Sequence, residues 1–168
     1  MTLTMDDSFL AQTGRLQRGP ASVGLFDDVR SSSPRGALVL EVKGDGAPAW
    51  LKEVVRRLNV AVAVAASEPG WTPMTNTAVI SSLRALRRVM TVDSIRPSVT
   101  PTPEGGLQFE WHEAGWDIEI EVEPDGSVET WGQHLHNGAT FHGPMNAAAE
   151  SLRVALKEIT LHHLAGND

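Results

Sequence analysis

The sequence contains no cysteine and no tyrosine, and its longest apolar run, residues 60–66, is short. Without cysteine the chain can form no disulfide and no thiolate metal site, and this composition fits a reducing compartment. A membrane-spanning helix needs roughly 20 apolar residues, so no such helix is expected. No segment combines a basic start, an apolar run and a small-residue cleavage site. We therefore expect a cytoplasmic protein that has no membrane partner.

Positive charge is also scarce, and it is unevenly distributed. No lysine or arginine occurs from Pro97 to Leu152, a stretch that holds ten carboxylates. The whole chain has a formal net charge of -7 and a pI near 5.3. Such a charge opposes general affinity for nucleic-acid phosphates and for anionic membranes. A nucleic-acid partner is therefore not expected.

The length of 168 residues suits one domain with a hydrophobic core. Residues 1–36 contain several turn-forming glycines, prolines and serines and show no sustained periodicity. They are predicted to be a flexible or loosely docked N-terminal segment. Residues 37–168 are predicted to form a single α+β domain.

The first half of this domain is predicted to contain two helices. A strand over 37–42 precedes a helix that starts at Pro48 and has apolar residues at helical spacing up to Leu58. The run over 60–66 predicts a buried strand, with continuation of the helix as the alternative. Thr75 or Asn76 can cap a second helix that ends near Met90.

The second half is predicted to be mainly β. Prolines at positions 97, 101 and 103 predict an extended connector. Alternating residues then predict strands over 107–112, 116–123 and 127–131, the last with a possible extension to residue 136, and a short fourth strand that ends near residue 142. A final helix is predicted from Pro144 to about Leu164. The fold class is thus an antiparallel β-meander of three to four strands packed against two to three helices.

Apolar and acidic residues alternate strictly from Trp116 to Glu123. Successive side chains of a strand point to opposite faces, so the acids form a row on the side away from the core. This acidic row would share its face with Glu110 of the preceding strand. It is interpreted as a surface for a basic protein partner, with a solvated face or a hard divalent cation as alternatives. The acids of the row are Asp117, Glu119, Glu121 and Glu123.

Two further features complete the predicted binding surface. Arg84, Arg87 and Arg88 lie on one flank of the second helix and could meet the acidic row of a second copy, which favours a homodimer. Trp131 has the parity of the residues that point outward from its strand, so it is predicted to be an exposed aromatic anchor.

Histidines offer a different interpretation. His134 and His136 share one face of a strand, and His142 follows six residues later. With Glu129 they could hold a divalent metal, because zinc and iron sites need three or four ligands around one point. A metal-binding protein or a metal-dependent hydrolase is therefore the alternative function.

Five short motifs are spread over about a third of the chain: Gly70-Trp71, Pro101–Gly106, Glu110-Trp111, Ile118–Ile120 and Pro124–Gly126. Through these motifs the chain resembles a family of small uncharacterised bacterial proteins. The family is loosely associated with toxin–antitoxin and phage-defence genes, and the resemblance implies a binding protein rather than an enzyme. The usual nucleophile, phosphate-binding and dinucleotide-binding motifs are absent from the sequence. We therefore predict a non-catalytic, antitoxin-like, immunity or accessory protein without a cofactor, whose partner is a basic protein such as a toxin or defence protein.

Overall fold

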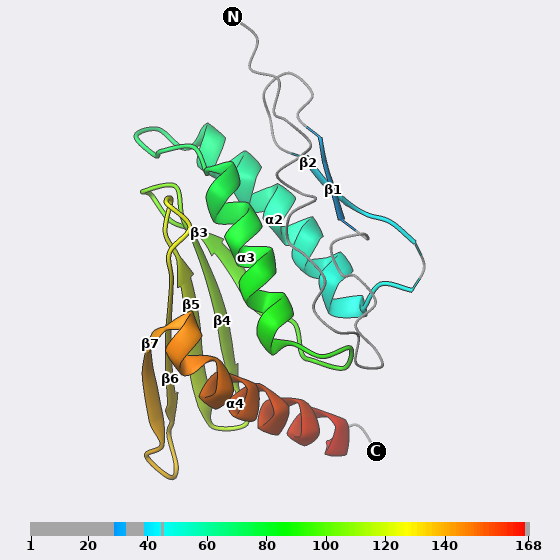
Figure 1. The fold of residues 1–168 in the computed structure, drawn as a ribbon, viewed down its shortest axis with the longest axis vertical. Helices are drawn as coiled ribbons and strands as arrows, with labels where there is room; N and C mark the ends of the chain where they lie inside the picture. The colour runs from blue at the N-terminus through cyan, green and yellow to red at the C-terminus, as the bar shows by residue number, and fades with distance from the viewer. Residues whose placement is uncertain (1–28, 33–38, 45, 167–168) are drawn as a thin grey trace, which may run out of the picture.

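The computed structural model describes residues 29–32, 39–44 and 46–166. Three helices cover one face of an antiparallel sheet (Figure 1). The helices are α2 (Ala49–Ser67), α3 (Asn76–Val89) and α4 (Met145–Ala165), and the sheet strands are β3 (Ser98–Pro101), β4 (Leu107–Glu113), β5 (Trp116–Val122), β6 (Val128–His134) and β7 (Thr140–Pro144). None of the described helices combines the length and apolar character needed to cross a bilayer.

The sheet is a simple meander, because its five strands are neighbours in sequence order from β3 to β7. This arrangement confirms the α+β class and adds one strand to the predicted number. The additional strand is β3, which occupies the predicted connector and pairs with β4. β3 can include Pro101 because an edge strand pairs on only one side, so a missing backbone N–H is tolerated there.

A separate hairpin precedes the sheet. β1 (Val29–Ser32) pairs antiparallel with β2 (Val39–Val42), which confirms the predicted strand over 39–42, the part of it that is described. The predicted flexible segment, residues 1–36, lies outside the described residues except for β1. The hairpin is joined to α2 by Asn59, whose side chain accepts a hydrogen bond from the Leu40 amide and donates one to the Leu40 carbonyl, both at 2.9 Å.

The predicted strand over 60–66 is wrong, because α2 continues to Ser67. The buried residues of this stretch are Ala61 and Ala65, four apart, while Val60 and Val64 are exposed. This spacing extends the buried stripe of the preceding helical turns and is not the alternation of a strand. The alternative of a continuing helix was therefore correct.

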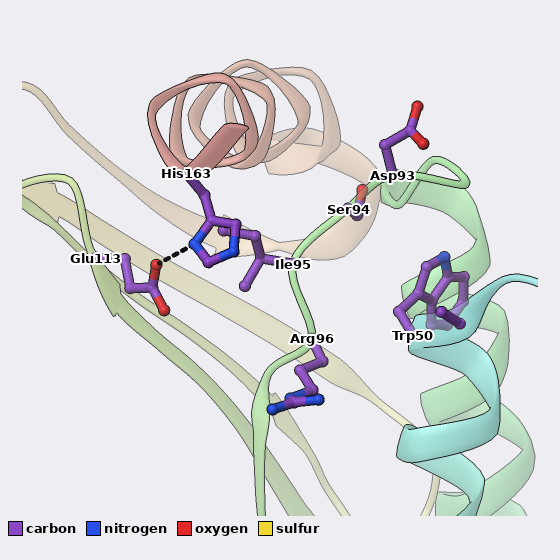
Figure 2. Close-up of a pocket in the computed structure, with 8 residues that line it drawn as sticks. Trp50, Asp93, Ser94, Ile95, Arg96, Glu113 and His163 are labelled. Carbon is purple, nitrogen blue, oxygen red and sulfur yellow. Dashed lines mark ion pairs between the residues drawn. The ribbon is translucent and has the colours of Figure 1, made fainter. Parts of the chain in front are cut away.

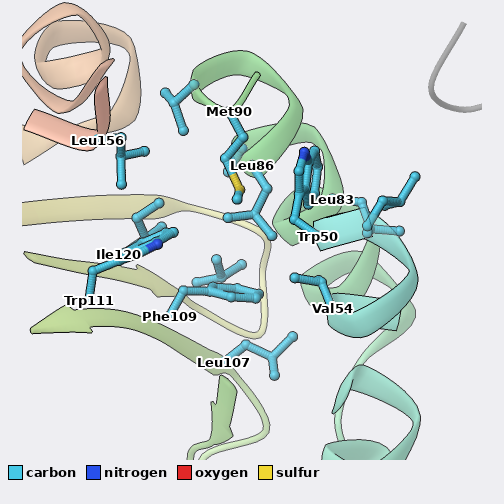
Figure 3. Packing of buried hydrophobic residues seen from close by; sticks show 14 of the residues in the cluster. Trp50, Val54, Leu83, Leu86, Met90, Leu107, Phe109, Trp111, Ile120 and Leu156 are labelled. Atoms are coloured by element: carbon cyan, nitrogen blue, oxygen red, sulfur yellow. The ribbon is translucent and has the colours of Figure 1, made fainter. Parts of the chain in front are cut away.

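The core lies between the inner face of the sheet and the three helices (Figure 3). Phe109 and Ile120 of neighbouring strands are fully buried and lie opposite each other in the β4–β5 register. They pack among Val54 of α2, Leu86 of α3 and Leu156 of α4. Burying one such side chain stabilises the fold by about 1.5–3 kcal/mol, so this layer fixes which face of the sheet remains outside.

Thr75 links the start of α3 to the turn between β5 and β6. Its Oγ1 accepts a hydrogen bond from the Ala78 amide at 3.0 Å, as expected of an N-cap. The same hydroxyl donates to the Pro124 carbonyl at 2.6 Å. The predicted cap is confirmed, and its second bond holds the β5–β6 turn against the helix.

Candidate functional site

The outer face of the sheet is the face away from the helices, and no described helix covers it (Figure 1). The alternation in β5 is as predicted: Trp116, Ile118, Ile120 and Val122 are buried, while the acids between them are half-buried or exposed. The strand parities and the register place the following side chains on the outer face: Gln108, Glu110, His112, Asp117, Glu119, Glu121, Glu129, Trp131, Gln133 and His142.

Like charges face one another across this surface. Glu110 of β4 lies directly opposite Glu119 of β5, and Glu121 of β5 lies directly opposite Glu129 of β6. Such cross-strand pairs destabilise a sheet, by up to about 1 kcal/mol each. The outer face therefore carries an electrostatic cost that core packing must offset.

Within the described ranges, the basic side chain that lies within ion-pair distance of these carboxylates is His112. His112 Nδ1 lies 2.5 Å from Asp117 Oδ1, and its Nε2 lies 3.9 Å from Glu110 Oε1. Among the described residues, no lysine or arginine side chain forms an ion pair with Glu119, Glu121 or any other carboxylate of this face. Within the described part of the chain, no arginine or lysine therefore neutralises the negative charge of the row.

The pKa of the Glu121 carboxyl is raised by its position on this face. Although Glu121 is exposed, partial burial raises the pKa of its carboxyl, and the nearby carboxylates Glu123, Glu119 and Glu104 raise it further. Glu123 lies just beyond β5, in the turn, where its amide donates to the Ser127 carbonyl at 3.0 Å. The acidic row therefore continues into the β5–β6 turn.

Trp131 lies within the acidic surface. It faces Glu119 on one side and His142 on the other, and 37% of its surface is exposed, as its parity predicted. A tryptophan face attracts ammonium and guanidinium groups. An exposed indole beside a carboxylate can thus bind a lysine or arginine side chain.

The predicted metal site is not assembled. His134 is buried on the inner face of β6, while His142 points to the outer face of β7. His134 Nδ1 accepts hydrogen bonds from the amides of His136 and Asn137, at 3.2 and 3.4 Å. Among residues 29–32, 39–44 and 46–166, no group of three or more histidine and acidic side chains could hold a metal ion. The prediction fails because strand parity separates His134 from His142.

His134 instead belongs to a contact between the sheet and α4. Its ring packs edge-on against Trp116, with centroids 5.0 Å apart. Glu158 of α4 accepts a hydrogen bond from Trp116 Nε1 at 3.0 Å, and its other oxygen lies 3.7 Å from His134 Nε2. Local sequence pattern does not indicate this contact, because Glu158 lies 42 residues from Trp116 and on a different element.

The three arginines of the predicted surface lie on α3, in the helical layer. Arg84 and Arg88 line a groove beside the β5–β6 turn, whereas Arg87 does not. The acidic row and the arginine flank are therefore two surfaces on different layers of the molecule.

A larger cavity, of about 360 Å³, lies between the start of α2, the segment after α3 and the end of α4 (Figure 2). Its wall includes Glu113 Oε2 at 3.8 Å from His163 Nδ1. Ser94 also lines it, but the Ser94 hydroxyl accepts a hydrogen bond from the Thr91 amide at 2.8 Å. The cavity thus contains an acid–base pair, whereas its serine hydroxyl is engaged in a local turn.

No protein-family model, curated protein or solved structure matches this chain. The resemblance to small bacterial proteins near toxin–antitoxin genes therefore stays a prediction.

Proposed function

We propose that this chain is a non-catalytic binding protein whose outer sheet face engages a basic surface of another protein. The main support is two pairs of carboxylates that face each other across the strands, Glu110 with Glu119 and Glu121 with Glu129. None of the four has an arginine or lysine partner among the described residues. A basic partner would relieve their repulsion and would gain complementary contacts.

The exposed Trp131 supports a protein partner rather than a free ion. Aromatic residues are enriched among the interface residues that contribute most to affinity. A guanidinium group stacked on this indole would lie beside Glu119, which is opposite Trp131 in the register. Side chains that rise in parallel from a flat sheet can contact the surface of another protein. They do not converge on one point, as the oxygen ligands of calcium or magnesium must.

The partner class that we propose is a basic protein such as a toxin or defence protein, which this domain would bind as an antitoxin, immunity or accessory protein. The acidic face would cover a basic active site or nucleic-acid groove of that partner. Support comes from the charge of the face and from the family resemblance. A homodimer, in which the arginine flank of α3 meets the acidic face of a second copy, is the competing arrangement.

Capture from extracts of the native host tests the proposal if three matched baits are compared. They are the wild type, the outer-face variant Glu119→Lys/Glu121→Lys, and the control Glu41→Lys/Glu68→Lys, which has the same net charge but changes exposed acids outside the five-stranded sheet. We expect a basic protein on the wild type and the control, and its loss from the outer-face variant. Equal capture by all three baits would contradict the proposal.

Molecular mass in solution distinguishes the competing homodimer from binding to another protein. A salt-sensitive dimer that is lost in both Glu119→Lys/Glu121→Lys and Arg84→Glu/Arg88→Glu would assign the acidic face to self-association. A monomer at low and high salt leaves the face free for another protein.

A further inference from the structure

A second surface of the molecule has the opposite charge. A groove of about 200 Å³ lies between α3, the β5–β6 turn and the start of α4. It is lined by Ser81, Arg84, Ala85, Arg88, Gly126, Val128 and Met145. Its only charged lining groups are two guanidinium groups, in a chain whose formal net charge is -7.

The two guanidinium groups lack a described counter-ion. Arg84 and Arg88 are four residues apart, so their side chains are neighbours on one face of α3, where like charges repel. Neither forms an ion pair with a described carboxylate. Asp125, next to the groove in sequence, is held by Ser127, whose amide and hydroxyl donate to its Oδ1 at 2.8 and 2.7 Å. Asp125 forms no ion pair with Arg84 or Arg88, so the described turn does not provide their counter-ion.

One wall of the groove is the β5–β6 turn, which packs closely against α3. Gly126 has a φ of +87°, and a Cβ at this position would lie 2.6 Å from the Ser81 hydroxyl and 2.8 Å from a methyl carbon of Thr77. Only glycine allows the turn to approach α3 this closely. The bond from Thr75 to the Pro124 carbonyl fixes the same turn from the other side. The arginines thus lie on a helix that packs closely against the turn.

We propose that the Arg84–Arg88 groove binds a compact dianion, namely the phosphate group of a small molecule. Two guanidinium forks can donate to separate oxygens of one tetrahedral phosphate group, whose charge of about -2 balances both arginines, whereas one carboxylate balances only one of them. The groove is smaller than the roughly 300–1,000 Å³ of pockets that enclose drug-sized ligands, so it accommodates a phosphate and little more. Met145, the first residue of α4, lines the groove, which places the positive end of that helix dipole beside it.

This site is independent of the acidic sheet face in position and in charge. Replacing both arginines leaves Glu119, Glu121 and Trp131 unchanged. Loss of phosphate binding and loss of partner binding can therefore be observed separately.

An amide NMR titration with sodium phosphate at pH 7.5, compared with sodium chloride at equal ionic strength, tests the proposal. We expect saturable shifts confined to the amides of 81–88, 126–128 and 145, and only small linear shifts with chloride. The Arg84→Gln/Arg88→Gln variant should bind phosphate roughly tenfold more weakly or not at all. The control Arg56→Gln/Arg96→Gln has the same net charge, lies outside the groove and should bind like the wild type.

Three results would overturn the proposal: phosphate shifts that match those of chloride, saturable shifts elsewhere in the spectrum, or unchanged affinity in the groove variant. The positions of the amides that shift in the wild type test the phosphate site even if the double variant misfolds. A parallel titration with glycerol phosphate and a phosphoserine peptide identifies the source of the phosphate. Tighter binding of the peptide would assign the site to a phosphorylated protein and would contradict a small-molecule ligand.

Discussion

Glu110 and Glu119 lie directly opposite each other on neighbouring strands, and neither has an arginine or lysine partner among the described residues. Their repulsion lowers the stability of the isolated domain without any gain in core packing. A basic partner would turn the same pair of carboxylates into a favourable contact. The charges that weaken the free domain would therefore strengthen its complex with a basic protein.

Removing one charge of the acidic row should stabilise the free protein. We expect Glu119→Gln to raise the free energy of unfolding by about 0.2–1 kcal/mol at low salt, because its cross-strand neighbour is Glu110. Urea denaturation measures this change, with Glu41→Gln, an exposed acid of the separate hairpin, as the control. An effect of equal size at 1 M salt would show that charge repulsion is not the cause.

Glu121 should make stability depend on pH. Its folded pKa is raised above the ordinary value of 4.5, so the folded state binds the proton more tightly than the unfolded state. Its unfavourable contribution is therefore fully present above the folded pKa, and the stability of the wild type falls as pH rises from 4.5 through that pKa. We expect Glu121→Gln to be more stable than the wild type at pH 7, with a smaller advantage at pH 4. Chemical denaturation at both pH values measures this, and an equal advantage at both would be inconsistent with the raised pKa.

Strand parity made this face predictable. The alternation from Trp116 to Val122 fixed which residues are buried, and the same parity identified Trp131 as exposed. His112 could have been placed beside Glu110 by the same rule, since the two are two residues apart on β4. The sequence could not show that His112 also meets Asp117, because that contact depends on the register of the β4–β5 pair.

Other features depend on contacts that local pattern does not encode. The valines and alanines of residues 60–66 are compatible with a strand or a helix. The helix forms here because it buries Ala61 and Ala65 against the rest of the fold. Strand β3 forms only because β4 offers a free edge. The groove beside Arg84 requires α3 and the β5–β6 turn to meet, although these segments are about 40 residues apart in the sequence.

The Thr75 hydroxyl should contribute to stability through two hydrogen bonds. We expect Thr75→Val, which keeps the side-chain shape, to lower the free energy of unfolding by about 1–2 kcal/mol through loss of the cap and of the bond to Pro124. Thr75→Ser keeps the hydroxyl and should lose much less. Thermal or urea denaturation distinguishes the two, and equal losses would mean that packing rather than hydrogen bonding is responsible.

Trp131 should matter for binding more than for folding. Trp131→Ala removes a partly exposed indole, so we expect a smaller loss of stability than from truncating the buried Phe109, for which about 3–5 kcal/mol is typical. Loss of an aromatic interface anchor typically costs 2 kcal/mol or more of binding free energy, roughly a thirtyfold weaker affinity. Denaturation and calorimetric titration of the captured partner measure the two effects. Unchanged affinity would place Trp131 outside the interface.

The purified protein should contain no stoichiometric transition metal. His134 and His142 lie on opposite faces of the sheet, and no described cluster provides three ligands. Elemental analysis of protein prepared without a histidine tag measures zinc, iron and manganese. One equivalent of any of them, lost on His134→Ala, would restore the metal-binding alternative.

The salt dependence of partner binding tests whether the acidic sheet face is the binding surface. The affinity of the captured partner is measured by calorimetry between 50 and about 500 mM salt, for the wild type and for Glu119→Lys/Glu121→Lys. We expect wild-type affinity to fall steeply with salt, and the variant to bind about a hundredfold more weakly at low salt, with a much flatter slope. Equal affinity and equal salt slope in the two proteins would contradict the assignment of the acidic sheet face as the binding surface.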